Sequence, residues 1–237
     1  MSSTDPTSSA SAINLLTSNG VHAILDVLLP EFRRATGHDV AARYGTGVEI
    51  LERIHAGESA DVVIANREAL ENLAREGKIE GASVRDLARS SVGVAVRSGL
   101  PKPDVSSVDA FKRAMLAADS IAFTGKGASG IHFQKLIERL GIAAEVRAKA
   151  VMQEGGLVGE LVVAGRATTA VQQIPELLAV AGIDYVGPLP MELQIVSQIS
   201  TGVFSDSRNR DGALALIEHL STPKNAHVYR TKGMEAG

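Results

Sequence analysis

Short apolar runs alternate with amphipathic helical patterns through the first third of the chain. The runs predict strands at residues 13–16, 40–44 and 61–65, each followed by a helix, at 21–36, 48–55 and 68–76. Pro30 lies inside the first of these helices and predicts a kink or two abutting helical turns. Gly37 supplies the residue that ends it. Three successive strand–loop–helix units indicate a parallel sheet covered by helices.

The middle of the chain departs from this order. A strand at residues 91–97 runs into an exposed turn containing Pro101 and Pro103 rather than into a helix. A second α/β series follows, with strands predicted at 121–124, 146–151 and 169–172, helices at 108–118, 129–140, 156–164 and 175–180, an extended run at 193–203, and closing helices at 211–220 and 224–231.

This order predicts an α/β fold of two lobes with a cleft between them. Residues 12–90 and 197–237 would form the first lobe and residues 91–196 the second. The runs 91–97 and 193–203 would be the two strands that cross from one lobe to the other. A chain that leaves a lobe and returns by such strands has a natural hinge.

Composition narrows the function classes. The 237 residues are 45% hydrophobic, which is enough for a real core. A net charge of −3, with 3% aromatic residues and no Trp, gives no basis for nucleic-acid binding. The absence of cysteine excludes disulfides, thiol nucleophiles and cysteine metal sites. No apolar run approaches the ~18–20 residues of a membrane span, so we expect no membrane insertion.

Residues 1–11 are rich in Ser and Thr and are predicted to be a disordered leader. They lack the basic and apolar regions of an export signal. We therefore expect a cytoplasmic protein if the sequence is complete as written, and a periplasmic one if it is a mature form.

Three small polar or glycine-rich loops each follow a strand and open a helix. They are residues 17–20, 45–47 and 125–129, and they bring the candidate ligand groups Ser18, Asn19, Thr46, Gly47, Ala128 and Ser129. In parallel α/β sheets, ligands bind at the carboxyl ends of strands, where helix N-termini favour anions. The alternative is that Ser18, Thr46 and Ser129 are merely helix N-caps.

Three further polar residues are candidates for the same site. Lys126 lies in the glycine-rich loop at 125–130, which is no Walker A motif, and could equally be a solvated surface lysine. Arg89 precedes the first crossing strand and has the side chain best shaped to clamp a carboxylate, unless it forms a surface salt bridge. Gln172 ends a strand, where it could bind a ligand or cap the next helix.

None of the six histidines has the spacing of a metal site, so we expect neither a metal nor a cofactor. His22 and His132 stand in the first turns of helices beside candidate loops. A histidine at a helix N-terminus tends to stay neutral, which suits a base, although each could be an ordinary surface residue.

Several segments resemble the molybdate-type branch of the type II periplasmic solute-binding proteins. They are residues 13–20, the helix end at 32–37, the G-x-x-A-D-V-x-I block at 57–64, the loop and helix at 127–141, and residues 232–235. The resemblance covers nearly everything after residue 11. It implies two lobes that close on a ligand, with Ser18, Thr46 with Gly47, and Ala128 with Ser129 at the binding positions. It also implies a monomer that delivers a small anion to an ABC permease.

The chain departs from the molybdate pattern at several of these positions. The resemblance leads us to expect paired hydroxyls in the first two loops and a Tyr near Gln172, where this chain has Ser-Asn, Thr-Gly and Gln. With Arg89 and Lys126 in the sequence, we expect an organic polycarboxylate rather than molybdate.

The alternative to a binding protein is an enzyme on the same scaffold. Residues 91–97, 101–104 and 186–190 are similar to a group of aconitate isomerases. Such an enzyme would remove an allylic proton and return it after bond rotation. In that case His132 or His22 would be the base and Arg89 and Lys126 the carboxylate clamps.

Overall fold

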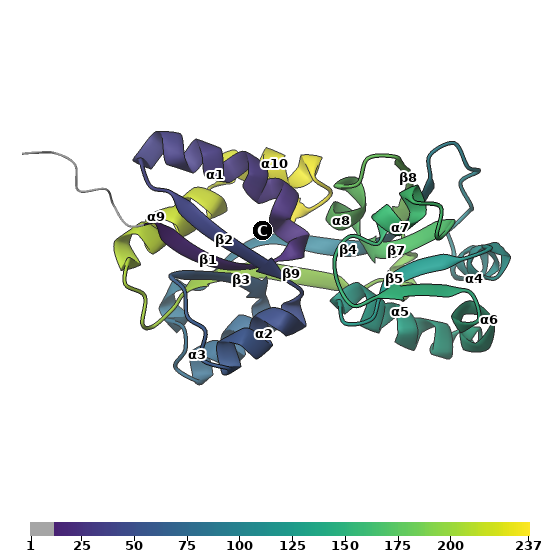
Figure 1. Cartoon of the computed structure of the whole chain (residues 1–237), viewed down its shortest axis with the longest axis horizontal. Coiled ribbons are helices and arrows are strands. Elements are labelled where there is room, and N and C mark those ends of the chain that lie inside the picture. The colour runs from purple at the N-terminus through teal and green to yellow at the C-terminus, as the bar shows by residue number, and fades with distance from the viewer. Residues whose placement is uncertain (1–11) are drawn as a thin grey trace, which may run out of the picture.

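The computed structural model describes residues 12–237 and shows two α/β lobes joined by two strands (Figure 1). The predicted leader, residues 1–11, lies outside the described residues. The strands are β1 Ile13–Ser18, β2 Val40–Gly45, β3 Val62–Asn66, β4 Arg85–Arg97, β5 Ile121–Thr124, β6 Ala150–Gln153, β7 Thr169–Gln173, β8 Ile183–Pro188, β9 Val196–Val203 and β10 Glu235–Ala236. The α-helices are α1 His22–Thr36, α2 Gly47–His55, α3 Arg67–Arg75, α4 Val108–Ala117, α5 Ala128–Arg139, α6 Ala143–Arg147, α7 Gly159–Val163, α8 Ile174–Leu178, α9 Arg210–Ser221 and α10 Ala226–Thr231.

The first lobe is built on a sheet in which β1 pairs in parallel with both β2 and β3. Helix α1 packs on this sheet because Leu25, Leu28 and Phe32 recur at helical spacing and are fully buried. Pro30 does not divide α1 into two helices, and the predicted kink stays a prediction. Pro30 lies on its exposed side, so the buried stripe stays continuous. Gly37 ends the helix at φ 78°, as predicted.

The second lobe contains β5, which pairs in parallel with β6 and β7. Its core is centred on Phe123 and Phe133, whose rings meet edge to face at 5.0 Å, with Phe111 edge-on to Phe133. The strand predicted at 146–151 was wrong in its first half. Ile142 and Val146 are buried four residues apart, which is helical spacing, and α6 occupies that stretch.

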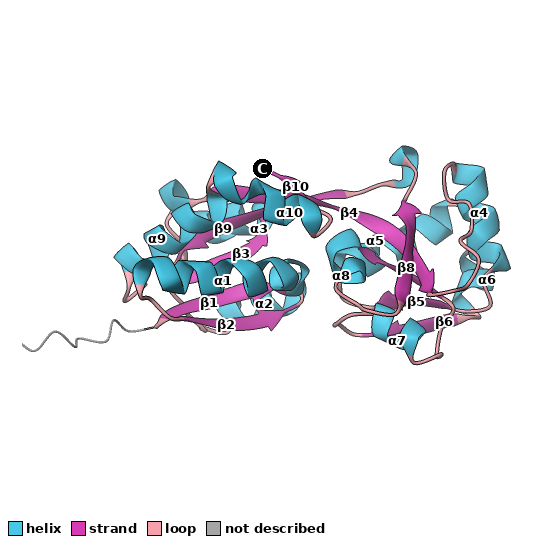
Figure 2. Cartoon of the chain, turned by 90° about the horizontal axis from the view of Figure 1, so that it is seen from above, coloured by secondary structure: helices cyan, strands magenta, loops and turns pink. Residues whose placement is uncertain are grey.

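Strands β4 and β9 cross between the lobes, as predicted (Figure 2). The first half of β4, to Ser91, pairs antiparallel with β9, and the second half, from Val92, pairs with β7 and β8. One sheet of ten strands therefore runs through both lobes. The lobe ranges 12–90 with 197–237, and 91–196, stay a prediction.

Two strands were not predicted as such. In β8, four of the six residues are only half-buried, so its apolar pattern is weak, and β10 has just two residues. Within residues 12–237, no helix is both long and apolar enough to cross a membrane.

Candidate functional site

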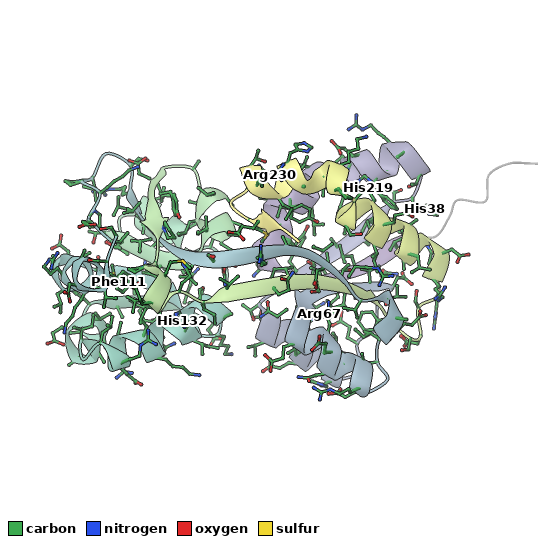
Figure 3. All side chains as sticks on the ribbon, turned by 180° about the vertical axis from the view of Figure 1, so that it is seen from behind. His38, Arg67, Phe111, His132, His219 and Arg230 are labelled. Carbon is green, nitrogen blue, oxygen red and sulfur yellow. The ribbon has the colours of Figure 1, made fainter. Side chains whose placement is uncertain are left out.

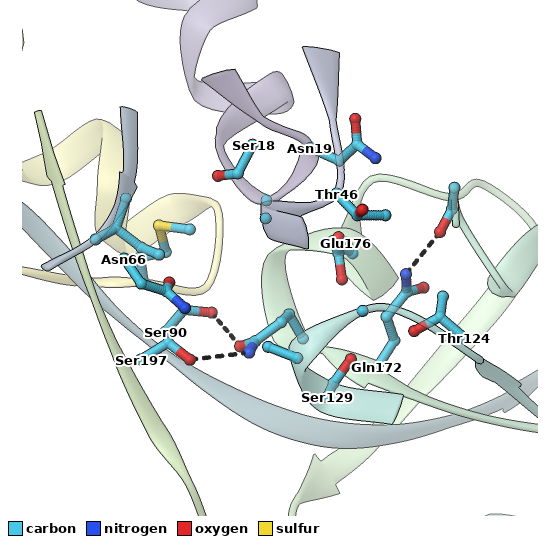
Figure 4. Close-up of a pocket in the computed structure, with 18 residues that line it drawn as sticks. Ser18, Asn19, Thr46, Asn66, Ser90, Thr124, Ser129, Gln172, Glu176 and Ser197 are labelled. Carbon is cyan, nitrogen blue, oxygen red and sulfur yellow. Dashed lines mark hydrogen bonds between the residues drawn. The ribbon is translucent and has the colours of Figure 1, made fainter. Parts of the chain in front are cut away.

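A hollow of about 70 Å³ lies between the lobes, where several strands end and helices begin (Figure 4). Both lobes and both crossing strands contribute to its wall. The lining residues are Ser18, Asn19, Gly20, Thr46, Gly47, Asn66, Ser90, Thr124, Gly127, Ala128, Ser129, Gly156, Gln172, Gln173, Glu176, Ser197, Ile199 and Met234.

The N-termini of α2 and α5 face this hollow from opposite lobes. Helix α2 begins after Thr46 in a capping box: the Thr46 hydroxyl accepts from the Glu49 N–H at 3.2 Å, and the Glu49 carboxylate accepts from the Thr46 N–H at 2.7 Å. The other N–H groups in the first turn of each helix have no hydrogen-bond partner within that helix, and they lie at the positive end of the helix dipole. The hollow is therefore favourable for an anion.

Two hydroxyl groups in the wall have no hydrogen-bond partner. Ser18 Oγ and Thr124 Oγ1 are both inaccessible to solvent and unpaired, and Thr124 is 3% exposed. A buried hydroxyl without a partner costs free energy, so such groups in native proteins call for an explanation. Both residues line the hollow, so a bound ligand with acceptor oxygens is one candidate partner for each hydroxyl.

The glycine-rich loop allows α5 to approach the end of β5. A Cβ atom on Gly130 would lie 1.7 Å from the Thr124 carbonyl oxygen, and one on Gly127 would lie 2.4 Å from Thr124 Oγ1. Gly127 is the N-cap of α5, and Ser129 lies inside the first turn. The glycines at 127 and 130 thus bring the α5 N-terminus to the hollow. The alternative prediction, in which Ser129 is the N-cap of this helix, was wrong.

A set of hydrogen bonds fixes the floor of the hollow. The Ser90 hydroxyl of β4 donates to Gln173 Oε1 at 2.6 Å, and Gln173 Nε2 donates to Ser197 Oγ of β9 at 3.3 Å. Gln172 accepts from the Val158 N–H at 2.9 Å and donates to the Gly156 carbonyl at 2.8 Å. These bonds tie the two crossing strands and the loop before α7 to the end of β7.

Glu176 is the one ionisable side chain among the described residues that line the hollow. Burial raises the pKa of its carboxyl to about 7, and hydrogen bonds to the Gln173 backbone and the Gln172 side chain offset part of this effect. A carboxyl with a raised pKa gives up its proton less readily than an ordinary glutamic acid. The site combines uncharged donors with one group that can carry a proton.

A second hollow, of about 230 Å³, adjoins the first. The two share four lining residues, namely Asn19, Gly20, Gly156 and Glu176. The second hollow also has His22 and Tyr44 in its wall, with ring centroids 4.4 Å apart. Together the two hollows offer more room than a single tetrahedral oxyanion requires.

The lobes approach each other closely beside this site. A Cβ atom on Gly155, in the loop between β6 and α7, would lie 2.7 Å from Thr46 Cγ2 of the other lobe. Ordinary carbon contacts are about 3.5–4.0 Å. The lobes therefore meet at Gly155 and Thr46 with no room for even a methyl group.

Comparison with known proteins identifies the family. Residues 13–235 match the family described as bacterial extracellular solute-binding protein. The chain belongs to this family. The aconitate isomerase of a Pseudomonas species is 34% identical over 229 residues, which cover 94% of this chain and 87% of that protein.

Solved structures of solute-binding proteins share the fold at much lower identity. The periplasmic molybdate-binding protein of Azotobacter vinelandii superposes with a TM-score of 0.79 at 16% identity, covering 94% of this chain and 98% of its own. The sulfate-binding protein SubI of Mycobacterium tuberculosis gives a TM-score of 0.75 at 16% identity, covering 95% and 86%. The two-lobed fold expected from the resemblance is confirmed.

Seven of the predicted ligand residues of this solute-binding protein line the first hollow. They are Ser18, Asn19, Thr46, Gly47, Ala128, Ser129 and Gln172. They meet there because the carboxyl ends of β1, β2, β5 and β7 all point toward the gap between the lobes. Gln172, however, already uses both ends of its amide group on the loop before α7.

Arg89 and Lys126 do not line either hollow. Arg89 is 53% exposed and pairs with Glu235 of β10 at 3.1 Å, which is the surface salt bridge of the alternative interpretation. Lys126 is exposed and pairs with Glu154 at 2.9 Å. Each of the two cations therefore pairs with a carboxylate outside the hollows, and the clamp role stays a prediction.

The two histidines predicted as candidate bases lie in different surroundings. His132 Nε2 lies 2.7 Å from the Leu193 carbonyl oxygen, which joins α5 to the segment before β9, and His132 lines neither hollow (Figure 3). His22 lines the second hollow and lies 3.5 Å from Asp26, with its side chain 54% exposed.

Sequence reasoning missed several residues of the wall, above all Asn66, Ser90, Thr124, Glu176 and Ser197. Thr124 ends a predicted strand directly before a predicted binding loop, so its position was a usable signal. Among the described residues, no group of three or more His, Asp or Glu is placed to hold a metal ion.

Proposed function

We propose that the chain binds a small organic polycarboxylate between its lobes and interconverts cis- and trans-aconitate. The observation that carries the proposal is the aconitate isomerase that is 34% identical to this chain over 94% of its length. The site supports it, because two contiguous hollows of about 70 and 230 Å³ offer room for a carbon chain as well as a carboxylate.

The hydrogen-bond donors of the hollow can bind carboxylate groups without a charged side chain. Peptide N–H groups at the starts of α2 and α5, with the unpaired hydroxyls of Ser18 and Thr124, provide hydrogen bonds to carboxylate oxygens. We assign ligand binding to these groups and to Asn19, Gly47, Ala128 and Ser129.

The reaction needs no redox change. A C–H bond of the CH2 group beside the alkene breaks, the proton passes to a base, and the electron pair spreads over three carbons and the attached carboxylates. After rotation about a former double bond, the proton returns to carbon and the alkene reforms. Donors already aimed at the carboxylates stabilise the charge that develops on them.

The test is to mix the wild-type chain with pure cis-aconitate in one reaction and pure trans-aconitate in another, and to follow both isomers by proton nuclear magnetic resonance. We expect both isomers to approach one equilibrium mixture from either side, at a rate proportional to protein concentration. A rate equal to that of buffer alone would overturn the isomerase proposal.

A second candidate is a binding protein that delivers an anion to an ABC permease outside the cytoplasm. The family match over residues 13–235 and the fold shared with molybdate- and sulfate-binding proteins support it. Stabilisation of the chain by tricarballylate (the saturated tricarboxylate), sulfate or molybdate in a thermal-shift assay, without isomer exchange, would favour this candidate. We expect the chain to act as a monomer in either case.

A further inference from the structure

The position of Glu176 suggests a specific role in the proposed reaction. It is one of four residues that line both hollows, and the only one of the four with an ionisable side chain. A ligand that anchors one carboxylate at the α2 and α5 N-termini and extends its carbon chain into the second hollow must pass this carboxyl.

We propose that Glu176 is the catalytic residue that takes the allylic proton from aconitate and returns it to carbon. This assignment rests on the proposed isomerase function. In the forward step the C–H bond breaks, its electron pair enters the allylic system, and the proton bonds to a Glu176 carboxylate oxygen. In the return step that O–H bond breaks and the proton joins either end of the allylic system, so no proton, electron or co-reactant is consumed.

The surroundings of Glu176 prepare it for this role. Hydrogen bonding from the Gln173 backbone and the Gln172 side chain lowers the pKa of the carboxyl against the larger effect of burial. Gln172 is itself fixed to Gly156 and Val158, and Gln173 to Ser90 and Ser197. The base is thus held on a buried network rather than on a free side chain. A carboxyl whose pKa is about 7 is well matched to accept and release a proton near neutrality.

Two charged residues on the strands packed against α8 are engaged with other partners. Arg89 of β4 pairs with Glu235, and Asp184 of β8 accepts hydrogen bonds from Ser98 and Gly99. Tyr185 of β8 has a pKa raised by burial to about 12, so it stays neutral.

His22, beside the short helix Asn19–Val21, is the remaining titratable candidate. Its side chain is half-exposed and lies 3.5 Å from Asp26, and of the two hollows it lines only the second. Glu176 is therefore less exposed than His22 and lines both hollows, whereas His22 lines only the second.

The decisive variant is Glu176→Gln, which keeps the shape of the side chain and removes its proton-accepting oxygen. General-base catalysis is worth about 10²–10⁴-fold, so we expect the isomerisation rate to fall at least about 100-fold. Binding of tricarballylate, measured by calorimetry, should stay within about 10-fold of wild type. Glu160→Gln, an exposed carboxyl on α7, is the matched control and should react like wild type.

The pH dependence of kcat/KM supplies the second readout. Wild type and Glu160→Gln should show a rate that rises with pH through about 7, because the base must be ionised. A wild-type rate that does not change between pH 6 and 8.5 would overturn the assignment even if Glu176→Gln failed to fold.

The possible outcomes separate the two proposals. If wild type interconverts the isomers and Glu176→Gln retains at least a third of its rate, the role of Glu176 is wrong and the isomerase function stands. If His22→Gln instead abolishes turnover with Glu176→Gln active, the base is His22. If wild type shows no turnover, the isomerase function is wrong and the proton-transfer role goes with it.

Discussion

The contact between Gly155 and Thr46 gives a direct way to test closure of the lobes on the ligand. Gly155 has no positive φ, so its backbone accepts alanine without strain. The new Cβ would meet one atom within 4 Å, Thr46 Cγ2 of the opposite lobe, at 2.7 Å. Gly155→Ala therefore introduces a clash that exists only while the lobes are together.

The magnitude follows from the cost of overpacking. Inserting a methyl group into a filled space costs about 1–3 kcal/mol. If this cost falls on the closed form alone, the affinity for tricarballylate drops about 5- to 150-fold. Folding stability without ligand should change little, because the lobes can separate slightly to relieve the contact.

A second substitution makes the test specific. Thr46→Ser removes Cγ2 but keeps the hydroxyl that accepts from the Glu49 N–H at 3.2 Å. We expect Gly155→Ala with Thr46→Ser to regain most of the affinity lost by Gly155→Ala alone, measured by titration calorimetry against both single variants. Wild-type affinity in Gly155→Ala, or no recovery in the double variant, would refute closure at this contact.

Three other substitutions test separate parts of the account. Because burial raises the pKa of Glu176 from 4.5 to about 7, the folded state binds more protons than the unfolded state between these values, and stability should fall by up to about 3 kcal/mol as pH rises through this range. Glu176→Gln should remove that loss, so the melting temperature of the variant minus that of wild type should be larger at pH 8 than at pH 4.5. An equal difference at the two pH values would contradict a raised pKa of Glu176. Gly130→Ala should abolish anion binding or folding, since its Cβ would lie 1.7 Å from the Thr124 carbonyl oxygen, whereas Gly125→Ala has no neighbour closer than 3.6 Å and should behave like wild type in the same melts and titrations. Arg89→Gln should alter tricarballylate affinity less than about 5-fold, because Arg89 lies outside both hollows and surface ion pairs contribute about 0–1 kcal/mol, and a 100-fold loss would establish Arg89 as a ligand clamp.

Local sequence was sufficient to find the part of the site that depends on strand ends. Ser18, Thr46 and Ser129 lie where a strand ends and a helix begins, and parallel pairing within each lobe brings those ends to the gap between the lobes. The two crossing strands were also predicted, because the run after Arg97 is a turn rather than a helix.

The rest depends on contacts between distant segments. Arg89 was placed correctly near the crossing strands, but its partner Glu235 comes from the far end of the chain. Glu176 looks like an ordinary residue of a short helix. Its burial requires the loops at Gly20 and Gly156, which lie far from it in sequence and share the wall of both hollows. Neither environment can be read from the neighbouring residues.

The central claim is that an organic polycarboxylate lies between the lobes at the starts of α2 and α5. A crystal structure of the chain with tricarballylate tests it most directly. We expect carboxylate oxygens within about 2.5–3.2 Å of Ser18 Oγ, Thr124 Oγ1 and the first N–H groups of α5, with the carbon chain beside Glu176. Tricarballylate bound outside both hollows, for example at Arg89, would contradict the account.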